Sequence, residues 1–196
     1  GVKNNDADTT VPDASIIKQT TEKPETTEAK PVEKKISRGI VSENVYTSEF
    51  LGVTFEKPEE WIYATDEEMA QLVDLGQDII ELNSLEKMLS ETATVYDMSA
   101  SDDKGNSVMI CYENTMLTAL REITEDEFEQ QLKENLAKVE DYEYVSSEDV
   151  TLGEGEFKKI VFTVTVENIT LSQAYYIKVI GKYAASVKKN YEKMLR

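Results

Sequence analysis

Acidic side chains are the most numerous groups in this chain that could bind a ligand, and several gather at one point. They open a predicted helix at 125–139, and they are Glu122, Glu125, Asp126, Glu127 and Glu129. Thr124 and Glu127 form a capping box, and the helix dipole favours negative charge at this end. A well-capped, solvated helix start is the simpler interpretation. The alternative is that Glu125, Asp126 and Glu129 belong to a surface for a cation or a cationic partner.

Two aromatic side chains beside a proline form a second candidate site. Trp61 and Tyr63 follow Pro58, and Trp and Tyr are residues that dominate binding hot spots. Their spacing indicates an aromatic contact surface. In the alternative interpretation, Trp61 closes the core where the first strand meets the first helix.

The composition excludes several kinds of catalytic and metal chemistry. The chain has no His and one Cys, Cys111, so Ser-His-Asp and Cys-His catalysis, a disulfide within the chain and the usual zinc ligand sets are absent. A carboxylate pair or a Ser-Lys arrangement stays open. Cys111 lies in an apolar run and is predicted to be a small buried side chain. Residues 102–106 are predicted to form a hairpin turn rather than a calcium loop, because Lys104 occupies a central place. We expect a non-catalytic protein without a cofactor or a metal.

Charge is unevenly distributed along the chain. Asp and Glu number 39 against 21 Lys and Arg, which gives a net charge of −18, and such a chain repels nucleic acid. Residues 157–196 are nevertheless basic, so we expect this part to pack against the acidic part before it. Most of its lysines are predicted to face solvent and to neutralise the acidic helices, with an anion site as the alternative; they are Lys158, Lys159, Lys178, Lys182, Lys188 and Lys189.

Hydrophobic periodicity predicts an α+β fold, an antiparallel β-sheet flanked by helices. The expected helices lie at 66–82, 84–90 and 125–139, with a last one that carries Tyr191, Met194 and Leu195. The expected strands lie at 49–55, 93–100, 107–113, 142–145, 149–152, 157–167, 169–180 and 183–187.

The first 44 residues differ from the rest in composition. They contain no aromatic residue and three of the four prolines, so residues 1–44 are predicted to be a disordered linker and 45–196 a single domain. The linker is typical of a spacer between a membrane-anchored N-terminus and a surface module, although a dispensable tail would look similar. We expect a targeting segment with a lipid-attachment cysteine to precede the chain in nature, and a protein of the cell surface.

The order of elements resembles a known family. Residues 50–61 place Pro58 and Trp61 directly after a strand, and the strand at 175–181 and a closing helix follow in a similar order to PsbP/Mog1-like domains. The chain also resembles small lipoproteins of Gram-positive gut bacteria (the Firmicutes type) with that architecture. The resemblance implies an α-β-α sandwich. It also implies either a short last strand or a further loop between Val187 and Lys188.

The functional expectation combines these observations. We expect a non-catalytic, extracytoplasmic module, tethered to the membrane only by its N-terminus, that acts through contact with a protein of the cell envelope. Binding of a cation or a small ligand at the acidic surface is the alternative.

Overall fold

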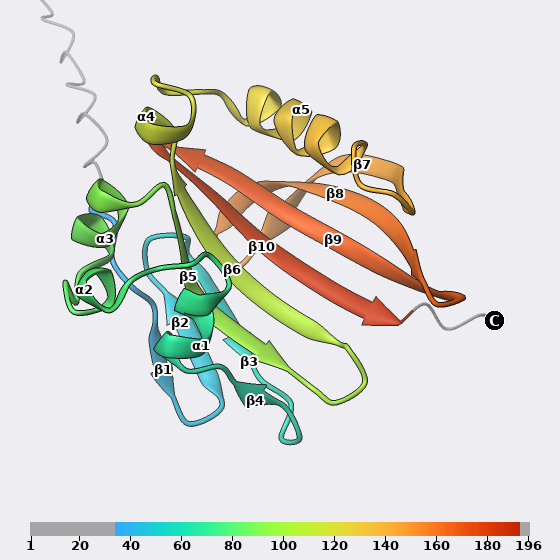
Figure 1. Cartoon of the computed structure of the whole chain (residues 1–196), viewed down its shortest axis with the longest axis horizontal. Coiled ribbons are helices and arrows are strands. Elements are labelled where there is room, and N and C mark those ends of the chain that lie inside the picture. The colour runs from blue at the N-terminus through green and yellow to red at the C-terminus, as the bar shows by residue number, and fades with distance from the viewer. Residues whose placement is uncertain (1–33, 193–196) are drawn as a thin grey trace, which may run out of the picture. The chain divides into compact units, whose positions relative to one another are not determined.

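The computed structural model describes residues 34–192. These residues belong to one compact unit, whose elements are shown in Figure 1. Its helices are α1 (Asp66–Gln71), α2 (Gln77–Ile80), α3 (Leu85–Glu91), α4 (Thr115–Thr118) and α5 (Glu125–Leu136). Its strands are β1 (Ile40–Ser42), β2 (Val45–Ser48), β3 (Val53–Glu56), β4 (Ile62–Tyr63), β5 (Thr94–Ser101), β6 (Ser107–Asn114), β7 (Tyr142–Leu152), β8 (Gly155–Val166), β9 (Ile169–Ile180) and β10 (Tyr183–Glu192).

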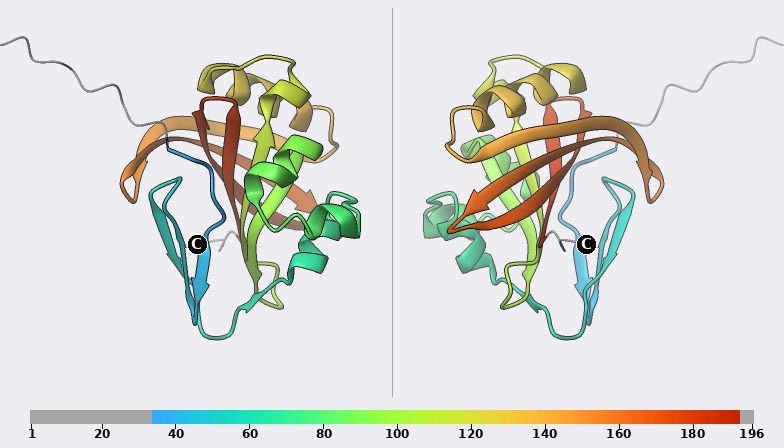
Figure 2. Two further views of the ribbon diagram at one scale, coloured as in Figure 1. Left: turned by 90° about the vertical axis from the view of Figure 1, so that its left-hand side faces the viewer. Right: turned by 90° about the vertical axis from the view of Figure 1, so that its right-hand side faces the viewer.

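The strands form two antiparallel sheets. The small sheet has the order β1-β2-β3, and the large sheet has the order β4-β5-β6-β10-β9-β8-β7. The predicted α+β class is therefore confirmed. Figure 2 shows the small sheet on one side of the large sheet and α1 and α2 on the other. The second face, which the resemblance assigned to helices, is thus covered by strands.

Strand β6 shows how the two faces of the large sheet differ. Its buried residues alternate, and Val108, Ile110 and Tyr112 point toward the small sheet, where the Tyr112 ring lies 5.9 Å from that of Phe50. The residues between them point to the opposite face, under α5. This period of two is what an antiparallel strand dictates.

Capping chemistry predicted the starts of two helices correctly. Thr65 and Thr124 each accept a hydrogen bond from the third helical N–H and receive the reciprocal bond from a glutamate. The expected helix at 66–82 is interrupted, however. Asp74 has a positive φ of 54°, and the chain restarts at α2 with Gly76 as its N-cap. Helix α5 ends at Leu136, short of the predicted 139.

The expected terminal helix and the short strand before it were wrong. Strand β10 continues through Lys188 to Glu192 and pairs with β9 on one side and β6 on the other. No loop interrupts it between Val187 and Lys188. Tyr191 lies in this strand and pairs with Ser172 of β9. Met194 and Leu195 lie outside the described residues.

Other strands differ from prediction in their bounds. The two strands expected at 142–145 and 149–152 are one strand, β7, with a bulge between Tyr144 and Ser146. Most of the strand expected at 49–55 is a turn that leads into β3. The hairpin expected at residues 102–106 is present, and a second hairpin joins β7 to β8. Strands β1, β2 and β4 and helix α4 were not anticipated.

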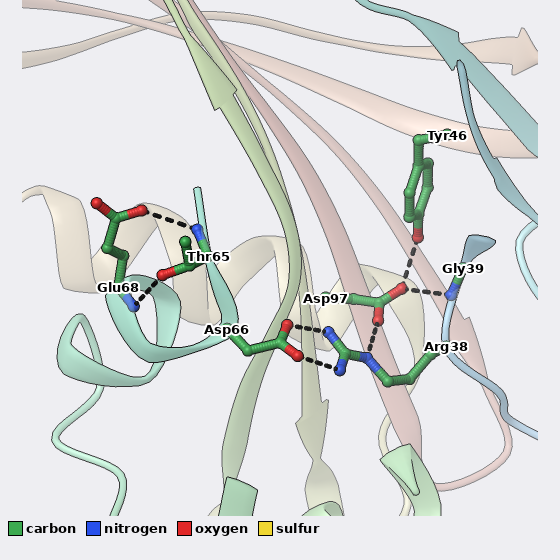
Figure 3. A network of polar contacts seen from close by, with 7 residues as sticks. All are labelled: Arg38, Gly39, Tyr46, Thr65, Asp66, Glu68 and Asp97. Carbon is green, nitrogen blue, oxygen red and sulfur yellow. Dashed lines mark hydrogen bonds and ion pairs between the residues drawn. The ribbon is translucent and has the colours of Figure 1, made fainter. Parts of the chain in front are cut away.

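The predicted linker extends too far into the domain. Residues 1–33 lie outside the described part, but residues 34–44 contain β1 and the buried side chain of Ile36. Arg38 helps to hold this stretch on the domain, because its guanidinium donates to Asp97 at 3.1 Å and to Asp66 at 2.7 Å (Figure 3). The composition of this stretch suggested a linker, whereas the contacts of Arg38, the buried Ile36 and the pairing of β1 with β2 attach it to the domain.

Asp97 is the centre of that polar network. Its side chain is fully buried at a β5 bulge and also accepts from the Tyr46 hydroxyl at 2.6 Å and the Gly39 N–H at 2.8 Å (Figure 3). Burial, and then the nearby carboxylate of Asp97, raise the pKa of Tyr46 far above its usual range. A buried carboxylate with three donors joins the small sheet to the large one.

None of the helices in residues 34–192 is long and apolar enough to cross a membrane.

Candidate functional site

An apolar cavity of about 340 Å³ lies between β3 and the large sheet. We call it the aromatic groove. Its walls include Phe55 of β3, Trp61 of the following turn, Leu152 of β7, Tyr176 of β9 and Val187 of β10. Strand β3 with its following turn thus meets β7, β9 and β10, which are distant in the sequence, and most of the wall is aliphatic or aromatic.

Trp61 is held in place by a tight turn. Its backbone N–H donates to Pro58 O at 3.1 Å, and the Lys57 ammonium donates to the carbonyls of Pro58 and Trp61. The indole is half-buried, and its ring centroid lies 6.2 Å from that of Phe55. Sequence analysis treated contact surface and core closure as alternatives for Trp61. In the structure, the indole packs against the core and also lines the groove; the contact surface stays a prediction.

One end of the groove is closed by a contact between two turns. The Glu154 N–H donates to Gly52 O at 2.9 Å and joins the β7–β8 turn to the turn before β3. Gly153, with a φ of +62°, allows this approach, because a Cβ there would lie 2.3 Å from Gly52 O. The groove is thus built by a specific backbone contact.

The outer edge of β3 has no strand partner among the described residues. The Lys57 N–H donates to Asn44 O at 2.7 Å across the β2–β3 ladder. Hydrogen-bonded and non-hydrogen-bonded pairs alternate along such a ladder, so the backbone groups of Thr54 and Glu56 point to the free edge. An unpaired edge beside an apolar groove is the arrangement that binds extended peptides.

A second hollow adjoins the groove across residues 58–62. We call it the acidic hollow; its volume is about 620 Å³, and its charged wall residues are Glu60, Glu68, Asp102 and Asp103. Tyr63 lines it, with its hydroxyl donating to Asn44 O at 3.1 Å. Trp61 therefore lines the aromatic groove and Tyr63 lines the acidic hollow, whereas a single aromatic surface was expected.

The acidic candidates of α5 are directed mainly to partners within the chain. Glu125 accepts from the Val179 N–H at 3.1 Å, and the Lys158 ammonium lies 2.9 Å from Asp126 and 3.4 Å from Glu129. The hydrogen bond that the Lys158 ammonium donates to Asp126 is the main cause that raises the pKa of Lys158. The basic late region thus packs against this acidic helix start, as expected.

Residues 102–106 form a hairpin turn, as predicted. Asp102 accepts from the backbone N–H groups of Lys104 and Asn106, both at 2.9 Å, and these bonds define the turn. Within residues 34–192, no group of three or more Asp, Glu or Cys side chains is placed to hold a metal ion.

Trp61 could be identified as a candidate from the sequence, but most of the other residues that line the aromatic groove could not. Leu152, Tyr176 and Val187 read as ordinary core residues of strands, and nothing local indicates that they face a hollow. The free edge of β3 was missed because its strand was expected at 49–55. The proline and the tryptophan after it were the usable signal.

Comparison with known proteins finds solved structures of similar fold but no matching sequence family. No protein-family description and no curated protein matches the chain. A solved structure with a similar fold is that of cyanobacterial PsbP (CyanoP) from Synechocystis in solution, which is 12% identical. The match covers 86% of this chain and 87% of that one, with a TM-score of 0.41. This neighbour comes from a family that the sequence resembles, but a likeness of this size says nothing of function.

Proposed function

We propose that this protein is a non-catalytic binding module that acts through contact with another protein. The partner contributes an extended segment in which a large apolar side chain stands next to basic residues. The apolar side chain enters the aromatic groove, the backbone pairs with the free edge of β3, and the basic residues lie over the acidic hollow. The observation that carries this proposal is the unpaired edge of β3 beside a groove lined by Phe55, Trp61 and Tyr176.

The chemistry of the groove supports binding over catalysis. Its only Asp, Glu or Lys side chains are Glu56 and Lys189, and both residues are exposed. A general acid and base work best in environments that separate their pKa values, usually by burial. An apolar wall with a half-buried indole instead suits a side chain that anchors a partner.

The charge of the surroundings supports a basic partner. Glu60, Glu68, Asp102 and Asp103 border the hollow next to Trp61, and the whole chain carries −18. Complementary charge speeds association and fixes the direction in which a segment lies. A segment with lysine or arginine beside its apolar anchor therefore fits both hollows at once.

We also propose that the module works outside the cytoplasm, attached by an N-terminal lipid anchor. The Thr- and Pro-rich composition of residues 1–33 supports a spacer between such an anchor and the domain. Cell fractionation of the natural full-length protein tests this proposal. A protein found only in the cytoplasm would contradict it.

Fluorescence provides the test of the groove, because Trp61 is the only tryptophan of the chain. The probe is an unlabelled peptide of alternating leucine and lysine, and the control peptide alternates leucine and glutamate. We expect the leucine-lysine peptide to shift the Trp61 emission to shorter wavelength in a saturable way. The control peptide should leave it unchanged.

Two matched proline variants make this test specific. Thr54→Pro removes an N–H that points to the free edge of β3, and Val41→Pro makes the same change on the far edge, β1, of the same sheet. Proline is tolerated where the strand N–H faces solvent. Thr54→Pro should weaken binding of the leucine-lysine peptide by about tenfold or more. The Val41→Pro variant should bind this peptide as well as the unmodified protein does. Equal binding by both variants would contradict pairing at β3.

A further inference from the structure

The opposite face of the large sheet holds a second cavity, under α5. We call it the polar cavity; its volume is about 220 Å³. Phe128 and Leu132 of α5 form its roof, and the β6 residues Met109, Cys111 and Glu113 contribute to its floor. Neither the aromatic groove nor the acidic hollow shares a residue with it.

The register of β6 and β10 places two opposite charges in this cavity. Glu113 lies opposite Ala184, and Lys188 lies opposite Met109. The two charged residues are thus four residues apart along neighbouring strands, or roughly 13 Å at about 3.3 Å per residue. Cys111 and Ser186 form the pair between them. The cavity therefore has an anionic end, a cationic end and a nearly neutral middle.

Neither charge is neutralised by the other. Among residues 34–192, neither the Glu113 carboxylate nor the Lys188 ammonium forms a hydrogen bond or an ion pair, and the Lys188 ammonium lies 5.6 Å from the centroid of the Tyr175 ring. Burial raises the pKa of Glu113 and lowers that of Lys188. Half-buried charges without protein partners cost stability, and a ligand that pairs with both of them would recover that cost.

We propose that the polar cavity binds a short linear zwitterion, an ω-amino acid, with its amine at Glu113 and its carboxylate at Lys188. The methylene chain lies over Cys111 and Ser186, under Phe128 and Leu132. Each end of such a ligand forms a charge-assisted hydrogen bond where the protein alone has none. A molecule with only one charge satisfies one end and leaves the other unpaired.

The roof and floor set the size of the ligand. A volume of about 220 Å³ is below the 300 to 1,000 Å³ that is usual for drug-sized molecules. It suits a chain of a few carbons with a charged group at each end. The polar cavity lies on the other face of the sheet. A negative result for ligand binding in this cavity and a negative result for peptide binding at the aromatic groove can therefore be told apart.

Calorimetric titration tests the proposal with a series of ω-amino acids, from γ-aminobutyrate to ω-aminocaprylate. Caproate, hexylamine and glycine serve as controls. We expect saturable binding of at least one member, ε-aminocaproate being the central choice, and an affinity at least about tenfold weaker for each control. Absence of binding by the whole series would overturn the proposal, as would equal binding of caproate or hexylamine.

Variants of the two charged residues complete the test. Glu113→Gln and Lys188→Met should each lose at least about tenfold in affinity for the responding ω-amino acid. Both should melt no lower than the unmodified protein, because each removes a half-buried charge. The controls Glu122→Gln and Lys138→Met change exposed residues near the ends of α5 and should bind normally. Unchanged binding by Glu113→Gln or Lys188→Met would overturn the proposal.

Discussion

The two faces of the large sheet are closed in different ways. On the face of Val108, Ile110 and Tyr112, the small sheet leaves an apolar groove with a free strand edge. On the face of Met109 and Glu113, α5 leaves a cavity with a charge at each end. The same strand builds both sites, because consecutive side chains of a strand point to opposite faces.

The difference between the faces separates two modes of binding. The groove offers apolar surface and backbone groups, which suit an extended protein segment. The polar cavity offers two fixed charges at a set distance, which suit one small molecule. Variants on one face should therefore leave binding on the other face intact.

The largest effect should come from Asp97, which attaches the small sheet. Asp97→Ala leaves Arg38, Gly39 and Tyr46 without their common acceptor. We expect a loss of about 3–5 kcal/mol in the free energy of unfolding, since a buried charge pair is broken. Urea unfolding followed by Trp61 fluorescence measures it. A loss under about 1 kcal/mol would show that this network is not what joins the two sheets.

A smaller effect should follow from shortening one wall of the groove. Phe55→Ala removes a half-buried ring that packs on Trp61 and should cost about 2 kcal/mol of unfolding free energy. It should also abolish the response to the leucine-lysine peptide. Binding of ω-amino acids, measured by calorimetry, should stay within about twofold of the unmodified protein. A large loss there would mean that the two faces are coupled.

On the polar face, a substitution should stabilise the protein. Glu113→Gln removes the cost of a half-buried carboxylate and should raise the unfolding free energy by about 1 kcal/mol at neutral pH. Burial raises the pKa of Glu113 in the folded state. As the pH falls, the Glu113 carboxylate of the unmodified protein is therefore protonated at a higher pH in the folded state than in the unfolded state. The advantage of the variant should therefore shrink through the folded pKa and vanish below about pH 4. Urea unfolding at several pH values measures this, and an advantage that persists in acid would contradict the assigned cause.

The smallest effect should come from Asp66, at the exposed end of the Arg38 network. The hydrogen bond from Arg38 lowers the pKa of Asp66. Its contribution should therefore be present above the unfolded pKa of about 4 and be lost as the pH falls through the folded value. Asp66→Asn should cost less than about 1 kcal/mol at neutral pH, because solvent screens this pair. Parallel thermal melts at neutral and acid pH measure it; a cost that is equal at both would contradict the ion pair as its source.

Sequence patterns that act over a few residues gave the reliable structural predictions. The threonine caps at Thr65 and Thr124 and the Asp102 turn act within a few residues, so the pattern alone predicted them. The last strand was predicted too short, because Tyr191, Met194 and Leu195 have helical spacing. What decides the structure of β10 is its position between β6 and β9, which are distant in the sequence.

The candidate sites show the same limit. Trp61 was identifiable from its proline turn, but Tyr176 and Val187 reach the groove only through the order of the sheet. Glu113 and Lys188 were counted as an ordinary acid and a surface lysine. Their common cavity depends on the β6–β10 register, which no local pattern reveals.

Amide hydrogen exchange with the leucine-lysine peptide tests the central claim most directly. If a partner segment pairs with β3, the N–H groups of Thr54 and Glu56, which point to the free edge, should exchange more slowly when the peptide is bound. Those of Val53 and Phe55, already paired with β2, should change little. Protection that is confined to residues outside β3, or is equal along the whole strand, would contradict pairing at this edge.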